Sequence, residues 1–173
     1  MKNSLKNLTL GVIILSLIGC SAIAPTYSAL PSTATAAEKT AALKTDAYNK
    51  LNDSTFQAYV KQVLITAGKI SISHATSDTD RAEISDQLYA WGSAFNSLST
   101  GTIVDSADLV NVVSTFNVKL DASKNSDFIS AANGAWLTVF PLLSLTGDSK
   151  LAITWLQIFA SAAQEVGSVY KTK

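Results

Sequence analysis

The stretch FISAANGAWLTVFPLLSL, residues 128–145, decides the fold of this chain. Its apolar side chains leave almost no polar face, and a helix that is apolar all round is a buried helix. We therefore expect residues 128–145 to form a helix in the middle of an all-α protein. Pro141 removes one backbone hydrogen bond, so we expect it to bend or end this helix.

The same stretch has a second interpretation, in which residues 131–145 and the last helix insert into a membrane as a hairpin. These are only about 15 residues, whereas a membrane-spanning helix needs about 20 apolar residues. The position of Trp136 close to Pro141 is also not an obvious membrane anchor. The buried core helix is therefore the favoured interpretation, and the hairpin is a minor alternative.

Apolar residues recur at helical spacing on both sides of this stretch. Short connections between such helices favour neighbours that run antiparallel. The sequence thus predicts a compact up-and-down bundle of five or six helices that forms one domain over residues 37–173, and its other helical segments are 38–52, 54–70, 80–98, 109–120 and 149–170.

Two helix starts carry the pattern of a capping box, in which a polar side chain and a residue three positions later satisfy each other's backbone amides. Ser54 with Gln57 predicts one start, and Asp80 with Glu83 predicts the other. The helical period is lost at residues 71–74, where we expect the first of these helices to end. Residues 102–104 are expected to be a short extended piece, followed by a cap at Asp105 or Ser106.

The N-terminus has the layout of a secretory signal peptide, with Lys2 and Lys6 followed by an apolar run over residues 8–18. The run ends in Leu17-Ile18-Gly19-Cys20, which holds the only cysteine of the chain. This tetrapeptide resembles the lipobox of bacterial lipoproteins. The resemblance implies that the Cys20 thiol receives diacylglycerol, that a signal peptidase cuts between Gly19 and Cys20, and that the new amine is acylated as well, for example with palmitate.

The resemblance predicts three parts: a signal peptide over residues 1–19, a lipidated cysteine and flexible tether over residues 20–36, and the helical domain over residues 37–173. The implied partner is a membrane, reached through the lipid anchor. With Ser21 after the cysteine, the expected location is the outer membrane and periplasm of a Gram-negative host. In a Gram-positive host it is the outer face of the cytoplasmic membrane.

Two rival interpretations of the N-terminus stay open. Small residues at 21–24 and 35–37 offer cut sites for an ordinary secretory signal peptidase. An uncleaved transmembrane anchor is less favoured, because the apolar run is short and includes Thr9 and Ser16.

Charge and composition exclude some functions and favour others. Loss of Lys2 and Lys6 from a balanced chain leaves a formal charge of −2, without the basic stripe that nucleic-acid binding needs. His74 is the only histidine; with Asp78, Asp80 and Glu83 it forms at most a weak cation or acid–base site, and helix capping is the simpler interpretation. Asp105 and Asp108 are likewise better explained by a helix dipole. We expect no catalytic residues, no metal and no cofactor.

The three tryptophans, Trp91, Trp136 and Trp155, fall on expected core faces, although they are also the candidates for lining a ligand pocket between helices. The leading hypothesis is a non-catalytic, lipid-anchored interaction or accessory module that binds a protein or a cell-wall component. A carrier of a small apolar ligand is the alternative. An enzyme comes third, and would bring His74 together with two or more carboxylates in a cleft.

Overall fold

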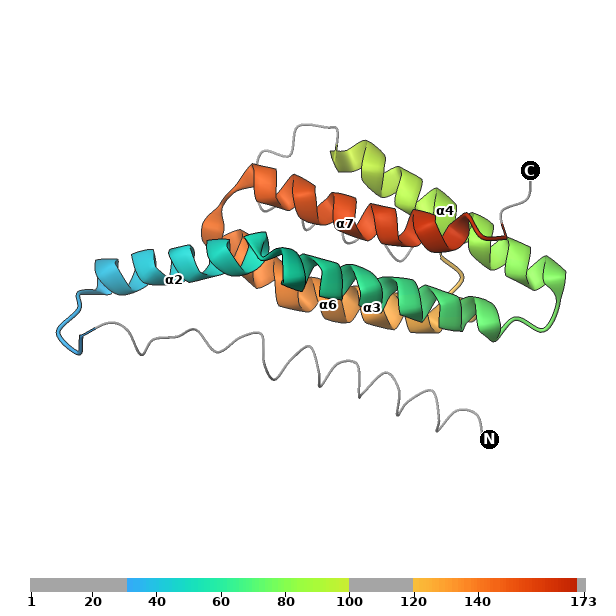
Figure 1. Ribbon diagram of the computed structural model, residues 1–173, viewed down its shortest axis with the longest axis horizontal. Helices are drawn as coiled ribbons and strands as arrows, with labels where there is room; N and C mark the ends of the chain where they lie inside the picture. The colour runs from blue at the N-terminus through green and yellow to red at the C-terminus, as the bar shows by residue number, and fades with distance from the viewer. Residues whose placement is uncertain (1–30, 100–119, 171–173) are drawn as a thin grey trace.

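The computed structural model describes residues 31–99 and 120–170, and these residues contain five α-helices and no β-strand (Figure 1). The predicted all-α bundle is confirmed. The extended piece at 102–104 and most of the helix expected at 109–120 lie outside the described residues. The helices are α2 (Ala36–Asn52), α3 (Ser54–Ser73), α4 (Asp78–Ser99), α6 (Ser126–Thr146) and α7 (Ser149–Gly167).

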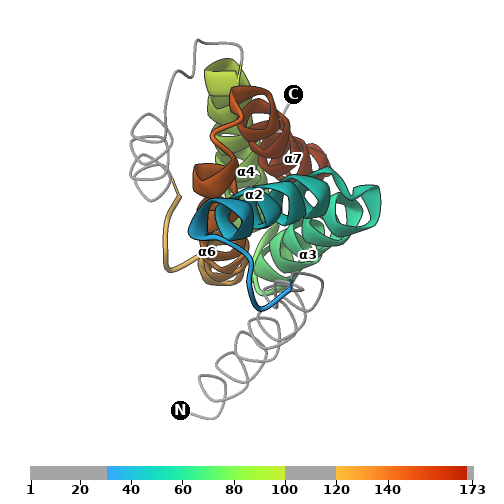
Figure 2. The ribbon, with the colours of Figure 1, turned by 90° about the vertical axis from the view of Figure 1, so that its left-hand side faces the viewer.

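The bundle has two layers, with α4 and α7 in one and α3 and α6 in the other (Figures 1 and 2). Short turns make α3 and α4 antiparallel at one end and α6 and α7 antiparallel at the other. A single residue, Asp53, separates α2 from α3, which is too short for a hairpin. As a result α2 packs chiefly on α6 and its first turns project beyond the bundle.

Helix α7 holds the central position that we expected for residues 128–145. It makes the most extensive contacts, above all with α4 and then with α3. Trp155 and Phe159 of α7 are fully buried. Helix α6 packs on α2 and α3 and keeps a solvent side, where Leu137 is 69% exposed.

Pro141 does not end α6, which continues to Thr146. A proline leaves the carbonyl four residues earlier without its helical donor. That carbonyl belongs to Leu137, and both residues are exposed, so water can satisfy it. In the described part of the chain, α6 is the one helix long and apolar enough to cross a membrane by length and composition, and half of its most apolar window is buried inside the bundle.

Helices α4 and α7 approach closely because glycines face the partner backbone. A Cβ atom at Gly92 would lie 2.6 Å from the carbonyl oxygen of Ala160, and a Cβ atom at Gly167 would lie 2.5 Å from the backbone nitrogen of Tyr89. Neither position has room for a side chain. The two glycines therefore set the distance between the two helices.

Both predicted capping boxes are wrong. The cap of α3 is Asp53, whose Oδ1 accepts from the amides of Thr55 and Phe56, 2.8 and 3.3 Å away. Helix α4 begins at Asp78, and the Oγ of Ser77 accepts from the amide of Asp80. The predicted caps lie one residue after Asp53 and three residues after Ser77, and the local pattern alone did not choose between these neighbours.

Some large apolar side chains within the predicted helical segments are exposed in the structure. Tyr48, Tyr59 and Leu98 lie at the margins of their apolar stripes, where a partly covered side chain faces water. Val169 and Tyr170 follow the end of α7, which stops at Gly167. The exposed fractions are 47% for Tyr48, 43% for Tyr59, 37% for Leu98, 59% for Val169 and 50% for Tyr170.

Candidate functional site

A charged cluster joins the start of α4 to the segment that enters α6. The Nζ of Lys124 lies 3.1 Å from the Oδ1 of Asp80 and 2.6 Å from the Oε2 of Glu83. Hydrogen bonds from Ser77, Lys124 and Thr76 lower the pKa of Asp80, and the bonds to Glu83 and Asp80 raise the pKa of Lys124. Lys124 pairs with both carboxylates, so the cluster joins the start of α4 to the segment before α6.

Gln87 extends this cluster into the bundle. Its Oε1 accepts from the backbone amide of Asp121 at 3.0 Å and from the Nδ2 of Asn125 at 2.8 Å. Its Nε2 donates to Glu83 at 3.2 Å. Asn125 is fully buried at the N-cap of α6, and its side chain is turned toward Gln87 instead of capping its own helix.

The start of α6 is capped by a different helix. The backbone amide of Phe128 donates to the Oγ of Ser71 on α3 at 3.2 Å, and Ser71 is fully buried. This contact also explains why α3 continues to Ser73, beyond the point where the apolar period is lost. Ser71 accepts a hydrogen bond inside the bundle, so a polar residue at this position does not indicate the end of α3.

His74 is not paired with the acidic residues that closely follow it in the sequence, with which it was expected to form at most a weak cation or acid–base site. Its Nδ1 lies 3.2 Å from the Oδ2 of Asp127 on α6, whereas Asp80 and Glu83 bind Lys124. The His74 side chain is half exposed, at 50%. Among the residues that the structure describes, no group of three or more His, Cys, Asp or Glu side chains is placed to hold a metal ion.

The three tryptophans are buried among other side chains. Trp91 stacks on Phe95 at a centroid distance of 4.2 Å and meets the edge of Phe128 at 5.3 Å. Trp136 packs on Phe159 at 5.9 Å and Trp155 on Phe56 at 5.4 Å. These rings build the core in the manner expected of apolar helix faces, and none of them lines the hollow described next.

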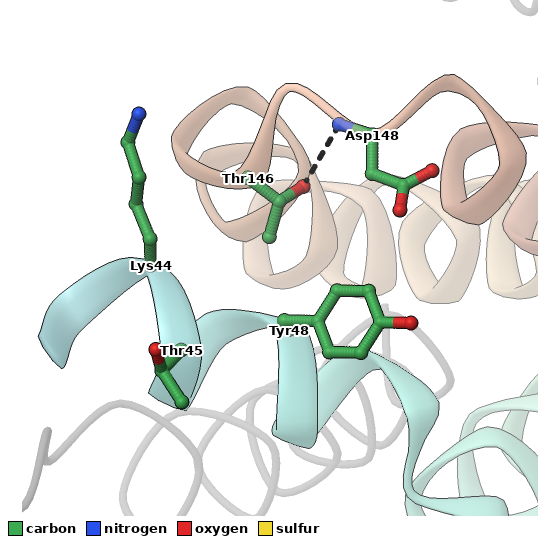
Figure 3. Close-up of a pocket in the computed structure, with 5 residues that line it drawn as sticks. All are labelled: Lys44, Thr45, Tyr48, Thr146 and Asp148. Atoms are coloured by element: carbon green, nitrogen blue, oxygen red, sulfur yellow. Dashed lines mark hydrogen bonds between the residues drawn. The ribbon is translucent and has the colours of Figure 1, made fainter. Parts of the chain in front are cut away.

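An open hollow lies between α2 and the turn that joins α6 to α7 (Figure 3), at the end of the bundle opposite the cluster around Lys124. Its volume is about 270 Å³, and it is lined by Lys44, Thr45, Tyr48, Thr146 and Asp148. The ring of Tyr48 lies across from Asp148 and Thr146 (Figure 3). The sequence offers no local motif for this site, because its two halves are about a hundred residues apart.

Gly19 and Cys20, the residues of the proposed lipidation site, lie outside the described residues, as do Asp105 and Asp108. Sequence reasoning also passed over Ser71, Gln87 and Asn125. Of these, only Asn125 carries a local signal, because an asparagine directly before an apolar helix is a common N-cap residue.

Comparisons with protein-family models, with curated proteins and with solved structures found no match to this chain.

Proposed function

We propose that this protein is a lipid-anchored helical module of the cell envelope, which acts by binding a protein or cell-wall partner and not by catalysis. The observation that carries the proposal is the place of the sole cysteine. Cys20 stands directly after Gly19 at the end of the apolar run over residues 8–18. Glycine before the cysteine allows the backbone to fit a peptidase groove.

Acylation would determine where the helical bundle works. One acyl chain holds a protein to a membrane only weakly, whereas two or three chains hold it almost permanently. Fifteen residues, 21–35, lie between Cys20 and Ala36, the first residue of α2. A random coil of this length spans roughly 20 to 25 Å on average. The bundle would thus stand just clear of the lipid headgroups, where envelope partners are accessible.

The chemistry of the described residues supports a binding role. Lys124 bridges Asp80 and Glu83, and the Nδ1 of His74 lies 3.2 Å from the Oδ2 of Asp127. A catalytic acid or base has to exchange protons with a substrate. Groups that hold two helices together are poorly suited to that work.

The anchor is tested by replacing Cys20 with Ala and following labelled fatty acid in the host. We expect Cys20→Ala to accumulate as unprocessed precursor without label, while the neighbouring control Ser21→Ala is processed and labelled normally. Maturation of Cys20→Ala with a new N-terminus within residues 21–37, and no label in either protein, would instead establish ordinary secretion.

The partner is tested by crosslinking in intact cells, followed by purification of the lipidated chain and mass spectrometry. We expect one envelope protein or wall fragment to be enriched over a control lipoprotein. Equal recovery of all envelope components from both proteins would contradict the binding role, whatever the outcome for Cys20.

A further inference from the structure

The hollow between α2 and the α6–α7 turn combines one aromatic ring with four polar side chains. We propose that it binds one neutral sugar ring of a glycan. The proposal rests on the proposed function for its context, since it names the chemical class of the envelope partner. Its own basis is the set of side chains that line the hollow (Figure 3).

Polar groups at the hollow are free for a ligand. Among the described residues, the Nζ of Lys44 and the hydroxyl of Tyr48 have no hydrogen-bond or ion-pair partner. Asp148 uses Oδ1 to accept from the amides of Lys150 and Leu151, which holds its side chain in place. Its Oδ2 has no partner in the described part of the chain, which leaves a fixed acceptor on a residue that lines the hollow.

The apolar part of the lining is a tyrosine ring. Tyr48 is 47% exposed, and its ring lies on α2 across from Thr146 and Asp148 (Figure 3). A sugar ring has an apolar C–H face and a rim of hydroxyl groups. An aromatic ring with polar groups around it matches both, because tyrosine combines an apolar body with a polar tip.

Charge and size favour a neutral ring over other ligands. One lysine and one aspartate give the hollow no net charge, which does not select an anion. Ion pairs at an exposed site are worth little in water, so a zwitterion held by Lys44 and Asp148 would gain little. The volume of about 270 Å³ is just below the range of pockets for drug-sized ligands. A single ring of a longer polymer fits an open hollow of this size.

The test uses the full chain in a micelle of sugar-free detergent and ligand-observed saturation-transfer NMR. The probes are chitotriose, cellotriose and maltotriose, at millimolar concentrations. We expect at least one probe to bind saturably, with little dependence on salt. Tyr48→Ala should weaken that binding roughly tenfold, and Asp148→Asn, which keeps the cap of α7, should weaken it roughly fivefold.

Tyr59→Ala is the matched control, because Tyr59 is a tyrosine of similar exposure on α3, 43% against 47%, outside the hollow. We expect it to bind as the unchanged chain does. Tyr48→Phe keeps the ring and should retain most of the binding, which separates loss of the site from loss of the fold.

Failure of all three sugars to bind would overturn the proposal, as would binding that Tyr48→Ala and Asp148→Asn leave unchanged. Salt-sensitive binding of phosphoethanolamine in place of the sugars would overturn it too, in favour of a zwitterion. These results are independent of lipidation. If Cys20 is labelled and no sugar binds, only the sugar site is refuted. If a sugar binds and Cys20 is not labelled, only the lipid anchor is refuted.

Discussion

The indole Nε1 of Trp155 donates a hydrogen bond to the carbonyl oxygen of Leu51, 3.2 Å away. Leu51 lies at the end of α2, where carbonyl groups lack helical donors. Its carbonyl also accepts from the Nε2 of Gln57 at 2.7 Å. The two side chains come from α7 and α3, so one backbone oxygen ties three helices together.

We expect Trp155→Phe to lower the free energy of unfolding by about 1 to 3 kcal/mol, through lost packing and one lost hydrogen bond. Gln57→Met should cost less. Each single change leaves the Leu51 carbonyl one donor, whereas the double change leaves it none. The double variant should therefore lose about 1 kcal/mol more than the sum of the two single losses.

Urea unfolding followed by far-ultraviolet circular dichroism measures all four proteins, in a chain that lacks residues 1–20. Losses that add within error would mean that water reaches the Leu51 carbonyl, against its complete burial in the structure.

Two fully buried serines should respond in opposite directions to the same substitution. Ser71→Ala leaves the buried amide of Phe128 without an acceptor, and should cost about 1 to 3 kcal/mol. Ser85→Ala removes a hydroxyl that has no hydrogen-bond partner among the described residues, and should be neutral or stabilising by up to about 1 kcal/mol. Thermal unfolding of the two variants gives the sign, and a comparable loss from both would show that the hydroxyl of Ser85 is bonded after all.

The features predicted from the sequence depend on residues close together in the chain, whereas the features that were missed depend on residues far apart in it. The burial of Trp91 and Trp155 followed from the period of their own helices, as did the start of α7 at Ser149. The bond between Ser71 and Phe128 joins residues 57 positions apart, and no local pattern encodes it.

The hollow is also formed by residues that lie far apart in the sequence. Tyr48 looks like one more residue of a weak apolar stripe, and Asp148 looks like a helix cap, which it is. They line one site only because α2 packs on α6 near the turn into α7. Helix pairing is a property of the folded bundle, so the site is visible only in three dimensions.

Alanine at three glycines in helix contacts should be costly in a defined order: Gly92 and Gly167 lie between α4 and α7, and Gly68 lies between α3 and α7. At Gly92 and Gly167 a Cβ atom would overlap backbone atoms, which cannot move without shifting a helix. At Gly68 the nearest atoms it would meet belong to the side chain of Val166, at 3.0 Å. We expect losses of about 1 to 3 kcal/mol or more for Gly92→Ala and Gly167→Ala, and a smaller loss for Gly68→Ala.

Chemical unfolding of the three variants tests this order. The better helix propensity of alanine works against the loss in each case, by up to about 1 kcal/mol, and acts on all three alike. A stabilised Gly92→Ala or Gly167→Ala protein would mean that α4 and α7 are further apart than the structure has them.

The cluster of Lys124 with Asp80 and Glu83 should make stability depend on pH in a predictable window. The folded pKa of Asp80 is lowered, so its contribution is present above the unfolded value of about 4 and is lost as the pH falls through the lowered pKa. The folded pKa of Lys124 is raised, so its contribution is present below about pH 10 and is lost as the pH rises through the raised pKa.

We therefore expect Lys124→Met to be less stable than the unchanged chain between about pH 4 and pH 10, and the difference to shrink toward both extremes. Urea midpoints measured across this range test the window. Lys61→Met is the control, because Lys61 pairs with Glu165 at 3.2 Å on the open surface, where an ion pair contributes little. A Lys124→Met deficit that is constant with pH would assign the role of Lys124 to the packing of its side-chain stem and not to its charge.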